Sequence, residues 1–213
     1  MMKNQEGFTL LELLISITLI AVLVVVLSMA LRTGINAYTR SKDYNRFYLP
    51  RTALYGLLWR QLEAITPNSN PYSLFVGEKD ALTFTTTCVP QGTGQGGIFQ
   101  VAYLFDESEE RIIYGQKIIT VRKNLESRIP EDLLRLDSER LSEKGWLTDE
   151  IQDVEEFLLT YKPTNARDKE NPDDWKDTVR RGSFIPSELA FKLRFKKQHK
   201  KDEPWQVLPV GIK

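Results

Sequence analysis

The sequence has very little of the chemistry on which most active sites depend. Among its 213 residues there is one cysteine, Cys88, and one histidine, His199. A lone cysteine excludes an intramolecular disulfide and provides no Cys-x-x-Cys redox or zinc motif. A lone histidine within KKQHKK provides neither a histidine-based metal site nor a Ser–His–Asp triad, and it is typical of a solvated surface. We therefore expect no catalytic residue, no metal site and no cofactor.

The chain also has no excess of either charge. Lys and Arg together number 29, as do Asp and Glu, so there is no general attraction to nucleic acid. In residues 187–196, however, basic side chains alternate with apolar ones, a pattern typical of a half-buried strand. Its basic face is either a nucleic-acid interface or a solvated strand surface. Zero net charge favours the solvated surface, and we expect no nucleic-acid partner. The basic residues are Lys192, Arg194 and Lys196, then Lys197, Lys200 and Lys201.

Two segments share only part of the pattern of ligand-binding loops. Residues 90–97, PQGTGQGG, lack the Gly-Lys-Ser/Thr of a phosphate loop, and a strand-like run rather than a helix follows them. We interpret them as a connection between strands. Residues 168–177 gather five acidic side chains that could bind calcium, but without the spacing of an EF-hand. These acidic residues are Asp168, Glu170, Asp173, Asp174 and Asp177.

Residues 8–31 form a long apolar run in which Glu12 is the only charged residue. As a helix they span roughly 36 Å, enough to cross a hydrocarbon core of about 30 Å. A secretory signal has a shorter apolar core that small residues follow, whereas here the small residue, Gly7, precedes the run. A carboxylate near a membrane span is costly and is usually functional, so Glu12 is the first candidate site residue.

The stretch KNQEGFTLLELLISITLIAVL closely resembles the class III signal of type IV pilins and type II secretion pseudopilins. The resemblance implies that a prepilin peptidase removes a leader of residues 1–7 by cutting after Gly7, and methylates the new N-terminus, Phe8. It also implies that Glu12 is the assembly carboxylate, paired with the α-amino group of a neighbouring subunit. Such pairing offsets the cost of a charge in a low-dielectric bundle and penalises the wrong register. The alternative is a plain signal anchor whose Glu12 reaches the cytoplasmic headgroups.

The charges that flank the run favour the opposite orientation. Arg32 and Arg40 follow it, while Lys3 before it is offset by Glu6. Two considerations outweigh this bias. The leader is too short to be more than a tail, so the soluble domain is the part that must be translocated. The resemblance implies the same orientation, with the N-terminus inside and the C-terminal domain outside. We therefore expect a single-pass inner-membrane protein with a cytoplasmic N-terminus and a periplasmic C-terminal domain, which then enters a filament.

Helical spacing continues beyond the apolar run. Apolar residues recur at intervals of three and four up to Ile65, which predicts one long helix from about Phe8 to Ile65 with a kink at Pro50. Its transmembrane, filament-core half would be residues 8–31, and its amphipathic half, residues 32–66, would continue into the soluble domain.

After Pro67 the sequence changes to short runs rich in β-branched and aromatic residues. We therefore expect an α+β fold in which the long helix packs on an antiparallel β-sheet domain, residues 67–213. Residues 130–141 are predicted to form a short amphipathic helix that covers the sheet. The predicted strands are 73–76, 81–87, 99–105, 111–115, 117–123, 154–163, 187–196 and 205–210.

A looser resemblance narrows the family. FVGEKDALTFTTTC and FQVAYLFDESEERIIY, then VEEFLLTYKP, Trp175 and IPSELAFKLRF, are similar to the domain of the J-type minor pseudopilin of type II secretion. This resemblance implies a structural, non-enzymatic subunit at or near the tip of the periplasmic pseudopilus. Its implied partners are other minor pseudopilins in a hetero-oligomeric tip complex and the inner-membrane assembly platform.

Two alternatives to the J-type interpretation stay open. The first is a minor type IV pilin that serves motility or DNA uptake, because the same pattern occurs in some of these proteins. In addition, the insertion at residues 124–153 is longer than we expect for the J type. The second alternative is a membrane-anchored extracytoplasmic binding module or enzyme.

Overall fold

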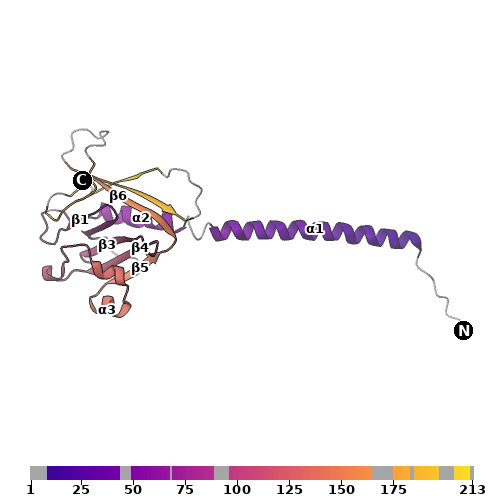
Figure 1. Ribbon diagram of the computed structural model, residues 1–213, viewed down its shortest axis with the longest axis horizontal. Helices are drawn as coiled ribbons and strands as arrows, with labels where there is room; N and C mark the ends of the chain where they lie inside the picture. Colours follow the sequence, from indigo (N-terminus) through magenta and orange to yellow (C-terminus); the bar gives the residue numbers. More distant parts are fainter. Residues whose placement is uncertain are drawn as a thin grey trace. The chain divides into compact units, whose positions relative to one another are not determined.

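The structure is a computed structural model that describes residues 9–43, 49–67, 69–88, 96–164, 175–182, 185–196 and 204–211. The chain divides into two compact units, Met1–Pro50 and Arg51–Lys213. The helices are α1 (Leu10–Asp43), α2 (Leu49–Glu63) and α3 (Ser138–Glu143), with 3-10 helices η2 (Arg122–Asn124) and η3 (Glu131–Arg135). The strands are β1 (Phe75–Gly77), β2 (Ala81–Thr86), β3 (Phe99–Asp106), β4 (Arg111–Ile118), β5 (Leu147–Ile151), β6 (Val154–Lys162), β7 (Glu188–Phe195) and β8 (Gln206–Pro209). A long apolar helix followed by antiparallel sheets confirms the expected α+β architecture (Figure 1).

The helical region differs in detail from the expected single helix. α1 ends at Asp43 and α2 begins at Leu49, and residues 44–48 between them lie outside the described part of the chain. Pro50, where a kink was expected, stands in the first turn of α2, where its missing N–H would have no intrahelical partner. α2 ends at Glu63, so Ile65 is not helical; it forms an isolated β-bridge with Thr86 instead.

The first sheet contains five antiparallel strands in the order β1-β2-β3-β4-β5. The prediction of separate strands at 111–115 and 117–123 is wrong, because β4 is continuous and pairs with β3 from Arg111 to Ile118. Gly115 lies inside this strand, opposite Ala102 of β3. Leu133 and Trp146 occupy the space that a side chain would need there, which explains the glycine. Beyond β4 the chain leaves the sheet and forms η2.

Residues 124–153 form a layer on this sheet instead of the one helix expected at 130–141. They contain η3, α3 and β5, which extends the sheet beside β4. Leu133, Leu141 and Trp146 are buried in one cluster with apolar residues of the sheet. The carboxylate of Glu126 accepts hydrogen bonds of 2.6 Å from Lys117 Nζ and 3.2 Å from Trp146 Nε1, so it joins this layer to β4.

The second sheet has the strand order β6-β7-β8. In β7, Phe191, Leu193 and Phe195 are buried while Lys192 and Arg194 are half-exposed, which confirms the predicted half-buried strand. The two sheets are linked where β6 passes the turn between β1 and β2. Leu159 N on β6 donates to Lys79 O, and the hydroxyl of Tyr161 donates to Glu78 O.

α2 contacts both sheets. The ring of Tyr55 lies 6.1 Å from that of Phe191 on β7. Near the C-terminal end of α2, Gln61 is bonded to Tyr103 and Tyr114 on β3 and β4. Burial raises the pKa of Tyr114 to about 12 and that of Tyr103 well above its usual value, so both phenols stay protonated. The packing surface of α2 is the buried set Leu54, Leu58, Gln61 and Leu62.

Candidate processing and assembly site

The candidate site begins where α1 begins. Gly7 and Phe8, the predicted cleavage and methylation positions, lie outside the described residues, and Thr9 is the first residue that the structure describes. Glu12, the predicted assembly carboxylate, occupies the first turn of α1. Its position relative to Thr9 is therefore the part of the site whose geometry is defined.

Thr9 and Glu12 form a reciprocal cap on the helix. The backbone N–H and the hydroxyl of Thr9 both donate to Glu12 Oε2, each at 3.1 Å, and Glu12 N donates to Thr9 Oγ1 at 3.3 Å. This is a capping box, in which an N-cap hydroxyl and a carboxylate three residues later satisfy each other's backbone donors. The signal, Thr-x-x-Glu before an apolar run, is visible in the sequence, where Glu12 also stands out as the only charge of the run.

The cap leaves the carboxylate only partly used. Oε2 of Glu12 accepts both bonds from Thr9, whereas Oε1 has no hydrogen-bond partner among the described residues. The negative charge is also favourable at the positive end of the helix macrodipole. The arrangement thus holds Glu12 at the start of the helix with one oxygen free to accept from a cationic group.

Three further hydroxyl groups of α1 donate to carbonyl oxygens of the same helix. Thr18 donates to Ile15 O and Ser28 donates to Val24 O, both at 2.8 Å, and Thr33 donates to Met29 O at 2.9 Å. An unpaired polar group in hydrocarbon costs roughly several kcal/mol, and these hydrogen bonds within the helix avoid that cost. Beyond Glu12, these three residues therefore add little polar surface to α1.

The apolar side chains of α1 are uncovered within the chain. α1 has 34 residues, and the stretch Leu10–Lys42 is long and apolar enough to cross a membrane, with none of its most apolar window buried. Its large apolar residues are between 48% exposed at Ile15 and 85% exposed at Leu10. A continuous surface of this kind needs lipid or other helices around it. An N-terminal membrane anchor fits this helix.

The other sequence candidates do not assemble into a second site in the described residues. On the predicted basic face, Lys192 lies 3.4 Å and Arg194 3.2 Å from a carboxylate oxygen of Glu156, and Lys196 pairs with Glu110. These pairs neutralise charge that a nucleic-acid interface would need. Asp177, the one described member of the predicted calcium segment, is exposed.

Several candidate segments lie wholly or largely outside the described residues. The glycine-rich connection is described only at Gly96 and Gly97, and the tail with His199, Lys197, Lys200 and Lys201 is not described. The acidic positions Asp168, Glu170, Asp173 and Asp174 lie outside as well. Among the described residues, no group of three or more His, Cys, Asp or Glu side chains is arranged to hold a metal ion.

Comparison with known proteins supports the N-terminal assignment. Residues 2–28 match the family described as the prokaryotic N-terminal methylation motif. No curated protein matches the chain. The match contains Gly7, Phe8, Thr9 and Glu12, and it coincides with the start of the uncovered apolar helix. The chain thus carries a prepilin-type signal on an α+β architecture, which supports a pilin- or pseudopilin-type protein for pilus or pseudopilus assembly.

Proposed function

We propose that this protein is a minor pseudopilin, a structural subunit at or near the tip of the periplasmic pseudopilus of a type II secretion system. A prepilin peptidase cuts after Gly7 and methylates Phe8, and the subunit then assembles through α1. The observation that carries this proposal is the combination of the methylation motif with an uncovered apolar helix capped by Thr9 and Glu12. The choice of secretion over other pilus machines rests on the resemblance of the C-terminal domain to the J type.

Glu12 has a defined part in this proposal. In an assembled bundle of α1 helices, its Oε1 accepts from the α-amino group that cleavage creates on Phe8 of a neighbour, while Oε2 stays bonded to Thr9. Pairing relieves the cost of both charges in a medium of low dielectric constant. A subunit shifted along the bundle would leave Glu12 unpaired, so the pair selects the register.

The soluble domain supplies contacts rather than chemistry in this proposal. It lies in the periplasm, with the N-terminus in the cytoplasm before extraction from the inner membrane. Its partners are other minor pseudopilins and the assembly platform, and it catalyses no reaction and binds no nucleic acid. The ion pairs of Lys192 and Arg194 with Glu156 support the last point.

A second candidate is a minor type IV pilin for motility or DNA uptake, because the methylation motif is common to both machines. Deletion of the gene in its native host separates the two. The proposal predicts loss of exported proteins from the medium with surface pili and DNA uptake intact. Loss of pili or DNA uptake with normal export would instead favour the type IV pilin. Complementation with the wild-type gene, but not with Glu12→Ala, attributes either defect to assembly of this subunit.

A further inference from the structure

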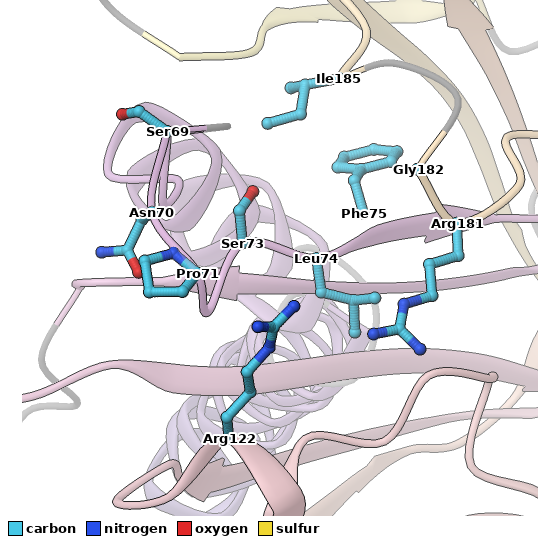
Figure 2. Close-up of a pocket in the computed structure, with 10 residues that line it drawn as sticks. All are labelled: Ser69, Asn70, Pro71, Ser73, Leu74, Phe75, Arg122, Arg181, Gly182 and Ile185. Atoms are coloured by element: carbon cyan, nitrogen blue, oxygen red, sulfur yellow. The ribbon is translucent and has the colours of Figure 1, made fainter.

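One cavity of the soluble domain has two arginines and no acidic residue in its described lining. It has a volume of about 460 Å³, and its described lining comes from three parts of the chain. These are Ser69, Asn70, Pro71, Ser73, Leu74 and Phe75, then Arg122, then Arg181, Gly182 and Ile185. Figure 2 shows Arg122 and Arg181 reaching from opposite elements into the space beside Leu74. We call this space the arginine cavity.

The two arginines have no carboxylate partner among the described residues. Neither Arg122 nor Arg181 forms an ion pair with another described residue, and none of the described lining residues is acidic. Elsewhere in the described part of the domain, eight basic side chains lie within 4 Å of a carboxylate oxygen: Arg111, Lys117, Arg140, Lys144, Lys162, Lys192, Arg194 and Lys196. Both arginines are exposed, and a carboxylate that enters the cavity can accept charge-assisted hydrogen bonds from a guanidinium group.

The backbone holds both arginines at the cavity. Arg122 begins η2, whose turn is closed by hydrogen bonds from Asn124 N to Val121 O and from Leu125 N to Arg122 O. Arg181 precedes Gly182, whose φ of +75° is a left-handed conformation that favours glycine. The turns to which they belong therefore place the backbone of both arginines at the cavity.

The remaining lining favours a peptide carboxylate over a free phosphate. Asn70 Oδ1 accepts from Tyr72 N at 2.9 Å, so the amide group has its N–H donors left to offer to a ligand. Leu74, Phe75 and Ile185 add an apolar wall next to these donors. Donors beside an apolar wall match an acidic side chain flanked by an apolar residue, whereas a phosphate would leave the wall unused.

We propose that the arginine cavity is a docking site for an acidic surface segment of a neighbouring pilin-like subunit. This inference rests on the proposed function, because only an assembling subunit has such a neighbour. A carboxylate of the partner bonds to Arg122 and Arg181, and an adjacent apolar side chain packs on Leu74. The contact adds specificity to an assembly that α1 alone would form between any two subunits with the same signal.

The test places a photo-crosslinking p-benzoylphenylalanine at Ser69, an exposed residue of the cavity rim, in the full chain within its native host. Illumination is expected to join this position to a second pilin-like subunit, at a peptide that contains Asp or Glu. The double variant Arg122→Glu with Arg181→Glu should lower the yield at least about tenfold, because like charges then face each other.

Matched controls come from the adjacent positions. The double variant Lys123→Glu with Arg180→Glu changes the net charge equally, but neither residue lines the arginine cavity, so its yield should stay near wild type. Reversal of the crosslinked acidic residue of the partner to Arg should restore the yield in the Arg122→Glu, Arg181→Glu variant. Thermal melting of each variant verifies that the domain is folded.

Other outcomes would overturn the inference. One is a crosslinked product whose yield does not change when both arginines are replaced by Glu. Another is a product with a lipid or with a second copy of this chain. The third is the absence of any product, both from Ser69 and from a second variant with the crosslinker at Pro71. N-terminal processing is measured in the same cells. A chain that is processed at Phe8 without an arginine-dependent product refutes only the docking site, whereas an unprocessed chain refutes the proposed function.

Discussion

The hydroxyl of Tyr103 donates a hydrogen bond of 2.6 Å to the side-chain oxygen of Gln61, and both residues are buried. Gln61 Nε2 in turn donates to the hydroxyl of Tyr114 at 2.7 Å, and Tyr114 donates to Gln116 at 2.7 Å. A single polar side chain on α2 thus joins the helix to two strands of the first sheet. Because every member has a partner, the network stabilises this orientation of α2 at little desolvation cost.

Gln61→Leu should destabilise the soluble domain by about 1–3 kcal/mol, because it leaves the buried hydroxyl of Tyr103 without an acceptor. The free energy of unfolding in urea measures this loss. Tyr103→Phe removes the stranded hydroxyl, so the double variant should be less destabilised than the two single losses added together. Strict additivity would show that the hydrogen bond does not couple α2 to the sheet.

Gly77→Ala should also destabilise the domain, by about 1–3 kcal/mol, through overpacking. A Cβ at Gly77 would lie 2.3 Å from the ring of Tyr161, which is fixed by a hydrogen bond of 2.8 Å to Glu78 O. Gly56→Ala in α2 is the matched control, since nothing lies within 4 Å of its Cβ position. There the helix should gain about 0.5–1 kcal/mol, and equal melting temperatures for both variants would refute the account.

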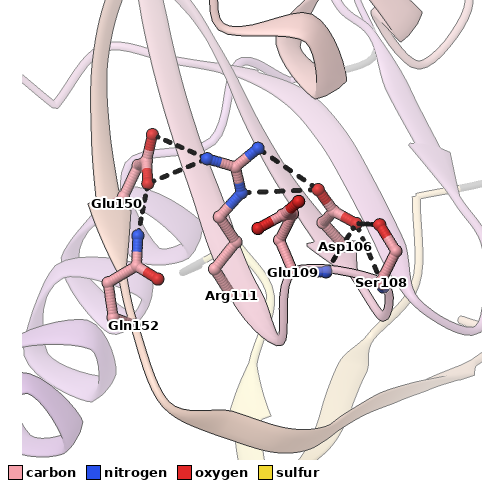
Figure 3. A network of polar contacts seen from close by, with 6 residues as sticks. All are labelled: Asp106, Ser108, Glu109, Arg111, Glu150 and Gln152. Atoms are coloured by element: carbon pink, nitrogen blue, oxygen red, sulfur yellow. Dashed lines mark hydrogen bonds and ion pairs between the residues drawn. The ribbon is translucent and has the colours of Figure 1, made fainter.

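The β3–β4 hairpin predicts a pH dependence of stability. Asp106 accepts hydrogen bonds from Ser108 and Glu109 N, and it pairs with Arg111, which also pairs with Glu150 on β5 (Figure 3). The hydrogen bond from the Ser108 hydroxyl is the main cause that lowers the pKa of Asp106 below its usual 3.8. A carboxylate with a lowered folded-state pKa stabilises the fold above its unfolded pKa, and this stabilisation disappears as the pH falls through the folded value.

Asp106→Asn should therefore be less stable than the wild type at pH 6, with the difference vanishing in strong acid, below the folded-state pKa. Urea unfolding at a series of pH values measures it. Glu107→Gln is the control, because Glu107 is exposed on the same turn and has no ion-pair partner among the described residues. A pH-independent deficit in Asp106→Asn would assign the effect to turn geometry rather than to charge.

Glu12 offers a choice between two physical roles, the cap and the charge. Glu12→Gln keeps an oxygen that can accept from Thr9, and glutamine is a normal member of a capping box, but it removes the charge. We expect Glu12→Gln to be cleaved normally and yet to fail in filament incorporation, as Glu12→Ala does. Thr9→Ser preserves the N-cap and should assemble. Assembly of Glu12→Gln at wild-type level would show that Glu12 acts as a cap.

Much of the fold follows from local patterns in the sequence. The alternation in residues 187–196 and the apolar runs of β2 and β3 mark strands whose burial the structure confirms. β5 escaped prediction because LTDEI has two adjacent acidic residues and no aromatic one, and its pairing with β4 is not visible in the sequence. The two strands predicted at 111–115 and 117–123 are one strand up to Ile118, and Gly115 inside it makes room for Leu133 and Trp146.

The candidate site was predictable in a different way. Glu12 stood out because a charge in an apolar run has a known cost, but the reciprocal bonding with Thr9 needs three-dimensional geometry. The arginine cavity was not predictable from the sequence, since Arg122 and Arg181 are far apart in the chain and neither belongs to a motif. Only the folded domain brings them to one space.

The most direct test of the central claim is the intact mass and N-terminal sequence of the protein recovered from membranes that contain the native prepilin peptidase. The account predicts a mature chain that begins at Phe8 and carries one added methyl group on its α-amino nitrogen. Gly7→Ala should block cleavage in a parallel culture. A wild-type chain that still begins at Met1 or Met2 would contradict the account and would leave Glu12 as a capping residue of a plain membrane anchor.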